Sequence, residues 1–113
     1  MPEHYGIEWA PVAQGDLDEI LKYIAARDGV TAAVAIYGKI MHRIETLTAH
    51  PARCRIPPEL EEVGVTEFRE LIETPYSVFF HIRGARLGIV GVLDRRRDLG
   101  ELLLQRVLRT PVA

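Results

Sequence analysis

The chain has 113 residues, of which 48% are hydrophobic and 27% charged, and this balance predicts a single domain over residues 1–113. No apolar run approaches the roughly 20 residues of a membrane span, and residues 1–11 lack the apolar core of a signal peptide, so we expect no membrane association. The net charge of −2 is unevenly distributed. Residues 1–68 are acidic, with 6 Lys/Arg and 11 Asp/Glu, and residues 69–113 are basic, with 8 Arg and 5 Asp/Glu. This distribution argues against a globally basic nucleic-acid binder.

The first part of the chain predicts a strand and two helices. Residues 5–9 alternate as in a short strand, which Pro11 ends. Apolar residues then recur at helical spacing over 12–29 and again over 33–47, where Thr31 is the expected N-cap. Because the link between the two patterns is short, we expect an antiparallel helical hairpin.

The second part predicts a loop and three strands. Prolines interrupt the helical pattern over 51–65, which leaves a loop with a short helical turn at 58–62. Alternating apolar and polar residues then predict strands over 66–73, 76–83 and 86–94.

A C-terminal helix is predicted over 98–109, where Leu99, Leu102 and Leu103 share one face, although Gly100 weakens the pattern. The complete order is β-α-α-β-β-β(-α). It defines an α+β fold in which an antiparallel sheet packs against the N-terminal helical hairpin.

The predicted strand 76–83 has two different faces. One carries Tyr76, Val78, Phe80 and Ile82, and the other carries Ser77, Phe79, His81 and Arg83. Because Phe79 shares its face with a histidine and an arginine, we expect a partner strand or helix to cover that side.

The basic part contains the segment VLDRRRDL, residues 92–99. Arginine offers a planar fork of donors that suits carboxylates and phosphates, so the triplet predicts contact with an anion or an acidic partner. The alternative is that the three arginines are solvated, while Asp94 and Asp98 neutralise them and cap the following helix.

Four segments, in this order, resemble the RelE/ParE superfamily of toxins from type II toxin–antitoxin modules. They are IEWAPVAQGDLDEILKYIA, IETLTAHPARCRIPPEL, FRELIETPYSVFFHI and VLDRRRDLGELL, and they cover most of residues 7–104. The resemblance implies a toxin of a plasmid-stabilisation module that a cognate antitoxin neutralises in a hetero-oligomer. One branch of the family poisons DNA gyrase by binding, and the other cleaves mRNA on the ribosome without a metal; a decayed, non-toxic relative is a third possibility.

The resemblance also implies candidate site residues. In a ribonuclease, Arg69 and Arg96, or Arg97 in place of Arg96, would hold the scissile phosphate. Ribonuclease members of the family commonly place a Tyr or His, as acid or base, shortly after the last of these arginines, but here no Tyr follows Tyr76 and no His follows His81, and Glu101 is a poor substitute as base. We therefore favour the ParE-like, gyrase-binding branch, in which the residues expected to contact the antitoxin or target are Arg69, Phe79, His81, Arg83, Arg96, Arg97 and Arg106. Arg69 has an equally supported structural alternative, namely pairing with Glu67 or Glu73 across the sheet.

No cofactor or metal is predicted. Cys54 is the only cysteine, which excludes an internal disulfide and indicates a cytoplasmic protein. Together with His42 and His50 it matches no zinc-binding spacing.

Overall fold

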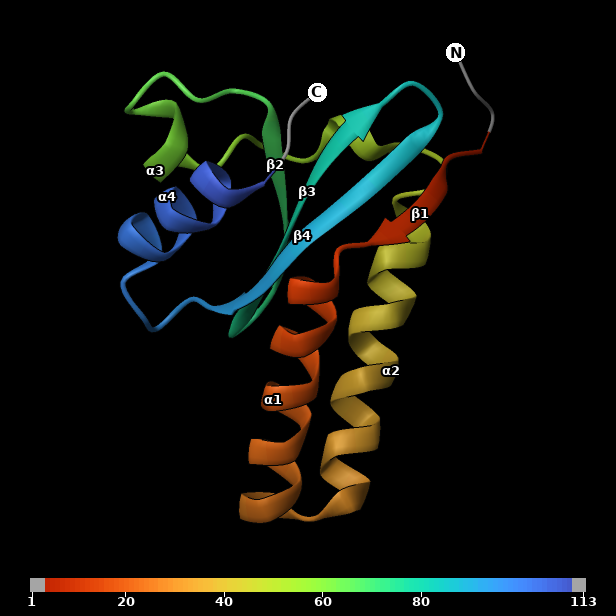
Figure 1. Cartoon of the computed structure of the whole chain (residues 1–113). Coiled ribbons are helices and arrows are strands. Elements are labelled where there is room, and N and C mark those ends of the chain that lie inside the picture. Colours follow the sequence, from red (N-terminus) through yellow and green to blue (C-terminus); the bar gives the residue numbers. More distant parts are fainter. Residues whose placement is uncertain (1–3, 111–113) are drawn as a thin grey trace.

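The computed structural model describes residues 4–110. It has a central sheet with helices on both faces (Figure 1). The elements, in chain order, are β1 (Gly6–Trp9), α1 (Pro11–Asp28), α2 (Val30–Thr46), the 3₁₀ turn η1 (Pro51–Arg53), α3 (Pro58–Glu61), β2 (Phe68–Glu73), β3 (Tyr76–Arg83), β4 (Arg86–Asp94) and α4 (Leu99–Arg109). This order confirms the α+β fold class and the predicted C-terminal helix.

The four strands lie in the order β1-β4-β3-β2. The pairs β2–β3 and β3–β4 are antiparallel, as expected of consecutive strands joined by short turns. Strand β1 pairs parallel with β4, in a register that places Gly6 opposite Arg86. The sheet is therefore mixed and not purely antiparallel, because the helical hairpin between β1 and β2 is long enough to return the chain to the same end of the sheet.

Glycine at position 29 separates the two helices of the hairpin. Its φ of 97° is a conformation that residues with a side chain rarely adopt, and its N–H donates to the Ala25 carbonyl at the end of α1. The same residue precedes Val30, the first residue of α2, so Thr31 lies inside the helix and the prediction that it is the N-cap was wrong. Figure 1 shows α1 and α2 side by side, with the turn that joins them well beyond the sheet.

Two apolar clusters form the core, one on each face of the sheet. Tyr76, Val78 and Phe80 of β3 pack with the hairpin helices, and Phe79 packs in the second cluster with α4 and the α3 segment. The predicted two-faced strand is thus confirmed. However, the Phe79 side chain is only 1% exposed, because the chain's own α4 covers the face that was expected to meet a partner.

Main-chain groups along the outer edge of β2 are bonded within the chain. The Glu70 N–H donates to the Arg55 carbonyl at 3.0 Å, which forms an isolated bridge to the preceding loop. The Ile72 carbonyl accepts a hydrogen bond from Nη2 of Arg43 in α2 at 3.2 Å. The loop and the hairpin therefore bind these two groups on the edge of the sheet.

Candidate functional site

The first arginine of the triplet is part of a buried ionic network. Nη1 of Arg95 donates to Oε2 of Glu70 at 3.0 Å and to the Ser77 hydroxyl at 2.7 Å. The Glu70 side chain is 0% exposed, and its other oxygen accepts from Nε of Arg55 at 2.6 Å. A buried carboxylate requires such partners, so Arg95 connects the end of β4 to β2 and is not available for docking.

Arg69 has main-chain partners. Its Nη1 donates to the carbonyl oxygens of Cys54 at 2.7 Å and Ala52 at 3.2 Å, and so attaches the loop after α2 to strand β2. Among the described residues it does not form the ion pair with Glu67 or Glu73 that was the structural alternative. Its structural role is thus stabilisation of a loop through carbonyl groups.

We expect Arg69→Ala to lower the free energy of unfolding by about 1–2 kcal/mol, because two carbonyls would lose a charged donor at a half-buried site. Urea denaturation followed by circular dichroism measures the change. Arg86→Ala, which removes an exposed arginine paired with Glu8, is the control and should change the value by less than about 0.5 kcal/mol. Equal stability of the two variants would contradict this role for Arg69.

Arg106 connects α4 to α1 across strand β4. Its guanidinium forms two hydrogen bonds to Asp16, Nη1 to Oδ2 at 2.6 Å and Nη2 to Oδ1 at 3.0 Å. Nη1 also donates to the Val90 carbonyl at 2.8 Å, and Asp16 Oδ2 accepts the Val92 N–H at 3.0 Å. A methyl group at Gly91 would lie 2.9 Å from Nη1, so glycine provides the room for this crossing. Arg106, which we expected to contact a partner, is therefore committed to the fold.

His81 and Arg83 lie towards the β3–β4 turn, where Arg83 is opposite Arg86. The His81 ring packs edge-on against Phe68, with ring centroids 6.0 Å apart, and burial lowers the pKa of the imidazole. Tyr76, at the other end of β3, is opposite Asp94. His81 and Arg83 are thus far along the sheet from Arg96 and Arg97, and the structure does not bring the predicted contact residues into one site.

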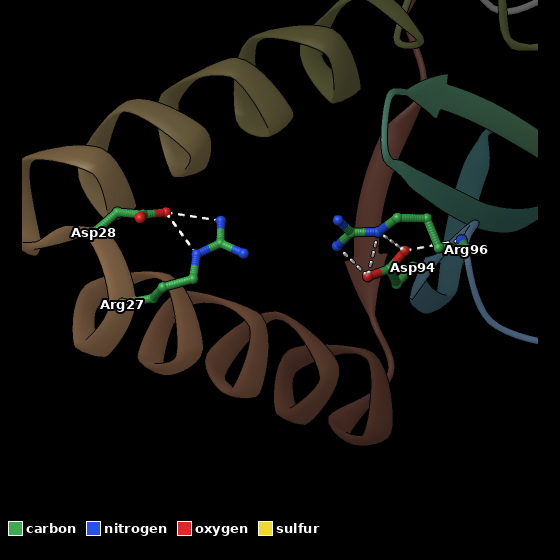
Figure 2. Close-up of polar contacts among 4 residues, drawn as sticks. All are labelled: Arg27, Asp28, Asp94 and Arg96. Atoms are coloured by element: carbon green, nitrogen blue, oxygen red, sulfur yellow. Dashed lines mark hydrogen bonds and ion pairs between the residues drawn. The ribbon is translucent and has the colours of Figure 1, made fainter.

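Arg96 lies instead opposite a residue that the sequence analysis did not identify, Arg27 near the end of α1. Nε and Nη2 of Arg96 donate to Asp94, at distances of 2.6 to 3.2 Å, and Nε and Nη2 of Arg27 donate to Asp28 at 2.9 and 2.7 Å. Figure 2 shows the two guanidinium groups facing each other across the opening between the helix and the strand.

Two adjoining hollows occupy this opening, and we call them together the arginine cleft. The first has a volume of about 230 Å³ and is lined by Glu19, Ile20, Tyr23, Ile24, Arg27, Tyr76, Asp94, Arg96 and Arg97. The second has a volume of about 310 Å³ and is lined by Ile24, Arg27, Asp28, Ala32, Ala35, Ile36, Pro75, Tyr76 and Arg96. Arg27 and Arg96 border both hollows, so the cleft combines cationic groups with apolar walls.

Four side chains of the arginine cleft have shifted pKa values. The hydrogen bond from Arg96 lowers the pKa of Asp94, and the same contact raises the pKa of Arg96. The hydrogen bond to Asp28 raises the pKa of Arg27, and burial raises the pKa of the Tyr76 phenol. General acid–base catalysis works best with groups whose pKa lies near the working pH, and these shifts move Asp94 and Tyr76 away from it.

The described residues offer no metal site, since no three His, Cys, Asp or Glu side chains in 4–110 come together as ligands. Cys54 is buried, and burial raises the pKa of its thiol. Asp98 accepts the Glu101 N–H at 3.4 Å, which confirms its predicted role as the cap of α4. None of the helices within the described part of the chain combines the length and apolar character needed to cross a bilayer.

Comparison with known protein families places the chain among the toxins of type II toxin–antitoxin systems. Residues 7–99 match the family described as the ParE toxin of the type II toxin–antitoxin system, parDE, and the chain belongs to that family. This match confirms the resemblance to the RelE/ParE superfamily and its ParE-like branch.

A solved structure supports the fold independently. It is described as a chromosomal ParDE toxin–antitoxin system from P. aeruginosa, and it aligns with a TM-score of 0.68 at 21% sequence identity, covering 82% of this chain and 98% of that chain. At this level of identity the likeness concerns the fold alone. No curated protein sequence matches the chain.

Proposed function

We propose that this toxin inhibits bacterial growth by binding a cytoplasmic target such as DNA gyrase, and that a cognate antitoxin neutralises it in a hetero-oligomer. The observation that carries the proposal is the arginine cleft in a ParE-family chain. It presents guanidinium groups for binding, while the shifts in pKa move Asp94 and Tyr76 away from proton transfer at neutral pH. Such a site favours recognition over bond cleavage.

The geometry gives less support to a ribosome-dependent ribonuclease. That function would require Arg69 and Arg96 to converge on one phosphate. Arg69 lies within β2 and donates to loop carbonyls, whereas Arg96 follows the end of β4 and pairs with Asp94. The two side chains thus have separate partners on different elements.

Expression of the chain alone, and together with the reading frame beside its gene, tests the proposal. We expect growth arrest with the chain alone and normal growth with both, and purified toxin should inhibit DNA supercoiling by gyrase. Normal growth despite a good yield of folded protein would contradict toxicity and favour a non-toxic relative. Codon-phased cuts in cellular mRNA, mapped by primer extension, would favour the ribonuclease alternative.

A further inference from the structure

We propose that the arginine cleft binds a carboxylate side chain of the antitoxin between Arg27 and Arg96, with a neighbouring apolar side chain of the same segment in the second hollow. This inference rests on the proposed function and specifies the chemistry of the partner. It adds Arg27 of α1 to the residues expected to contact the antitoxin.

Arg27 and Arg96 differ from the other paired arginines in the range of their contacts. Arg55, Arg95 and Arg106 connect elements that are distant in the sequence, whereas Arg27 pairs with the adjacent Asp28 and Arg96 pairs with Asp94 two residues away. The local pairs fix no tertiary contact. Loss of either should therefore leave the fold intact.

Both local pairs are also exposed and exchangeable. The side chain of Arg27 is 55% exposed and that of Arg96 63% exposed. Ion pairs with this exposure contribute little to stability, so a partner carboxylate can share or replace them at little cost. Each guanidinium uses Nε and Nη2 for its own carboxylate (Figure 2), and the guanidinium of Arg27 also lies over the ring of Tyr23 in the same helix, 5.2 Å from the ring centroid.

The surroundings favour a protein ligand over a nucleic acid. Three carboxylates, from Glu19, Asp28 and Asp94, line the cleft beside the three guanidiniums of Arg27, Arg96 and Arg97. A phosphate backbone gains affinity from many uncompensated cations, which this balance does not provide. A single carboxylate that lies between two facing guanidiniums meets the donor geometry that arginine offers.

The apolar wall adds a second requirement on the ligand. Ile24, Ala32, Ile36 and Pro75 line the second hollow next to both facing arginines. Burial of an apolar side chain there would remove apolar surface from water and so strengthen binding. The cleft therefore suits a segment in which an acidic residue and an apolar residue are close together.

Calorimetric titration with the small protein encoded beside this chain's gene tests the inference. We expect Arg27→Ala and Arg96→Ala each to weaken binding by about tenfold or more, and the double change to glutamate to weaken it further. Arg86→Ala is the matched control, because Arg86 lies at the opposite end of β4, is 66% exposed and also pairs with one carboxylate, Glu8. The affinity of the Arg86→Ala variant for the neighbouring protein should stay within about twofold of that of the unmodified toxin.

Two readouts make the outcomes distinct. Thermal unfolding should be unchanged in the alanine variants, and in double-mutant cycles one Asp or Glu of the antitoxin should couple to Arg27 or Arg96. Unchanged affinity in both variants would overturn the inference and leave the proposed function standing. If the unmodified toxin does not bind the neighbouring protein, both are overturned. If these variants lose binding to RNA and retain binding to the antitoxin, the cleft recognises a nucleic acid and the inference is wrong.

Discussion

Arg95→Ala is expected to lower the free energy of unfolding by about 3 kcal/mol, because it removes one partner of a carboxylate that has no access to water. Among the residues that the structure describes, Arg55 would remain as the charged partner of Glu70, and the buried Ser77 hydroxyl would lose its donor. Urea denaturation monitored by circular dichroism measures the loss. For a chain of this size it would be a large part of the total stability.

The neighbouring arginine provides the control for that experiment. Arg96→Ala removes an exposed, local ion pair and should leave the urea concentration at the midpoint of unfolding unchanged. Glu70→Gln keeps the shape and one acceptor oxygen, so its loss should be smaller than that of Arg95→Ala. Equal losses of stability in Arg95→Ala and Arg96→Ala would contradict the conclusion that Arg95 is structural and Arg96 is not.

Asp16→Ala is expected to lower the free energy of unfolding by about 2–3 kcal/mol. The change leaves the partly buried Arg106 without its carboxylate and the Val92 N–H without its acceptor. Both groups belong to the contact that connects α1, β4 and α4. We therefore expect the Val92 amide to exchange with solvent faster than the amides in the middle of β3.

Denaturation and hydrogen exchange measured by NMR test this expectation together. Asp16→Asn is the matched variant, because its amide oxygen can still accept from Val92 while the ion pair to Arg106 is lost. Its loss of stability should lie between zero and that of the alanine variant. A destabilised alanine variant in which Val92 exchange is unaltered would show that the stability does not come through this contact.

The sequence predicted the fold where local patterns determine it. The bounds of β3 and β4 agree with the predicted strands 76–83 and 86–94, because alternating residues flank a tight turn. The parallel pairing of β1 was not predictable in this way, since it depends on where the helical hairpin returns the chain. Thr31 failed as a cap because Gly29, with its positive φ, ends one helix and precedes the next.

The candidate site was less predictable than the fold. Nothing local to VLDRRRDL distinguishes Arg95, which turns towards a buried carboxylate, from Arg96, which turns towards solvent. Arg27 carries no motif, and only the packing of α1 beside the end of β4 brings it opposite Arg96. We expected a partner to cover Phe79, because the predicted order of elements did not show which face of the sheet the C-terminal helix would cover.

The bonded main-chain groups at the borders of the sheet affect how this toxin behaves when it is made in excess. Sheet edges with unpaired N–H and C=O groups promote association between copies of a protein and, in time, aggregation. On β2 the Glu70 N–H and the Ile72 carbonyl are bonded. Beyond β1, the Val90 carbonyl on β4 accepts from Arg106 and the Val92 N–H donates to Asp16. At these positions the sheet cannot template another chain through its backbone. An excess of free toxin is therefore protected there from edge-to-edge assembly by its own arginines and aspartate.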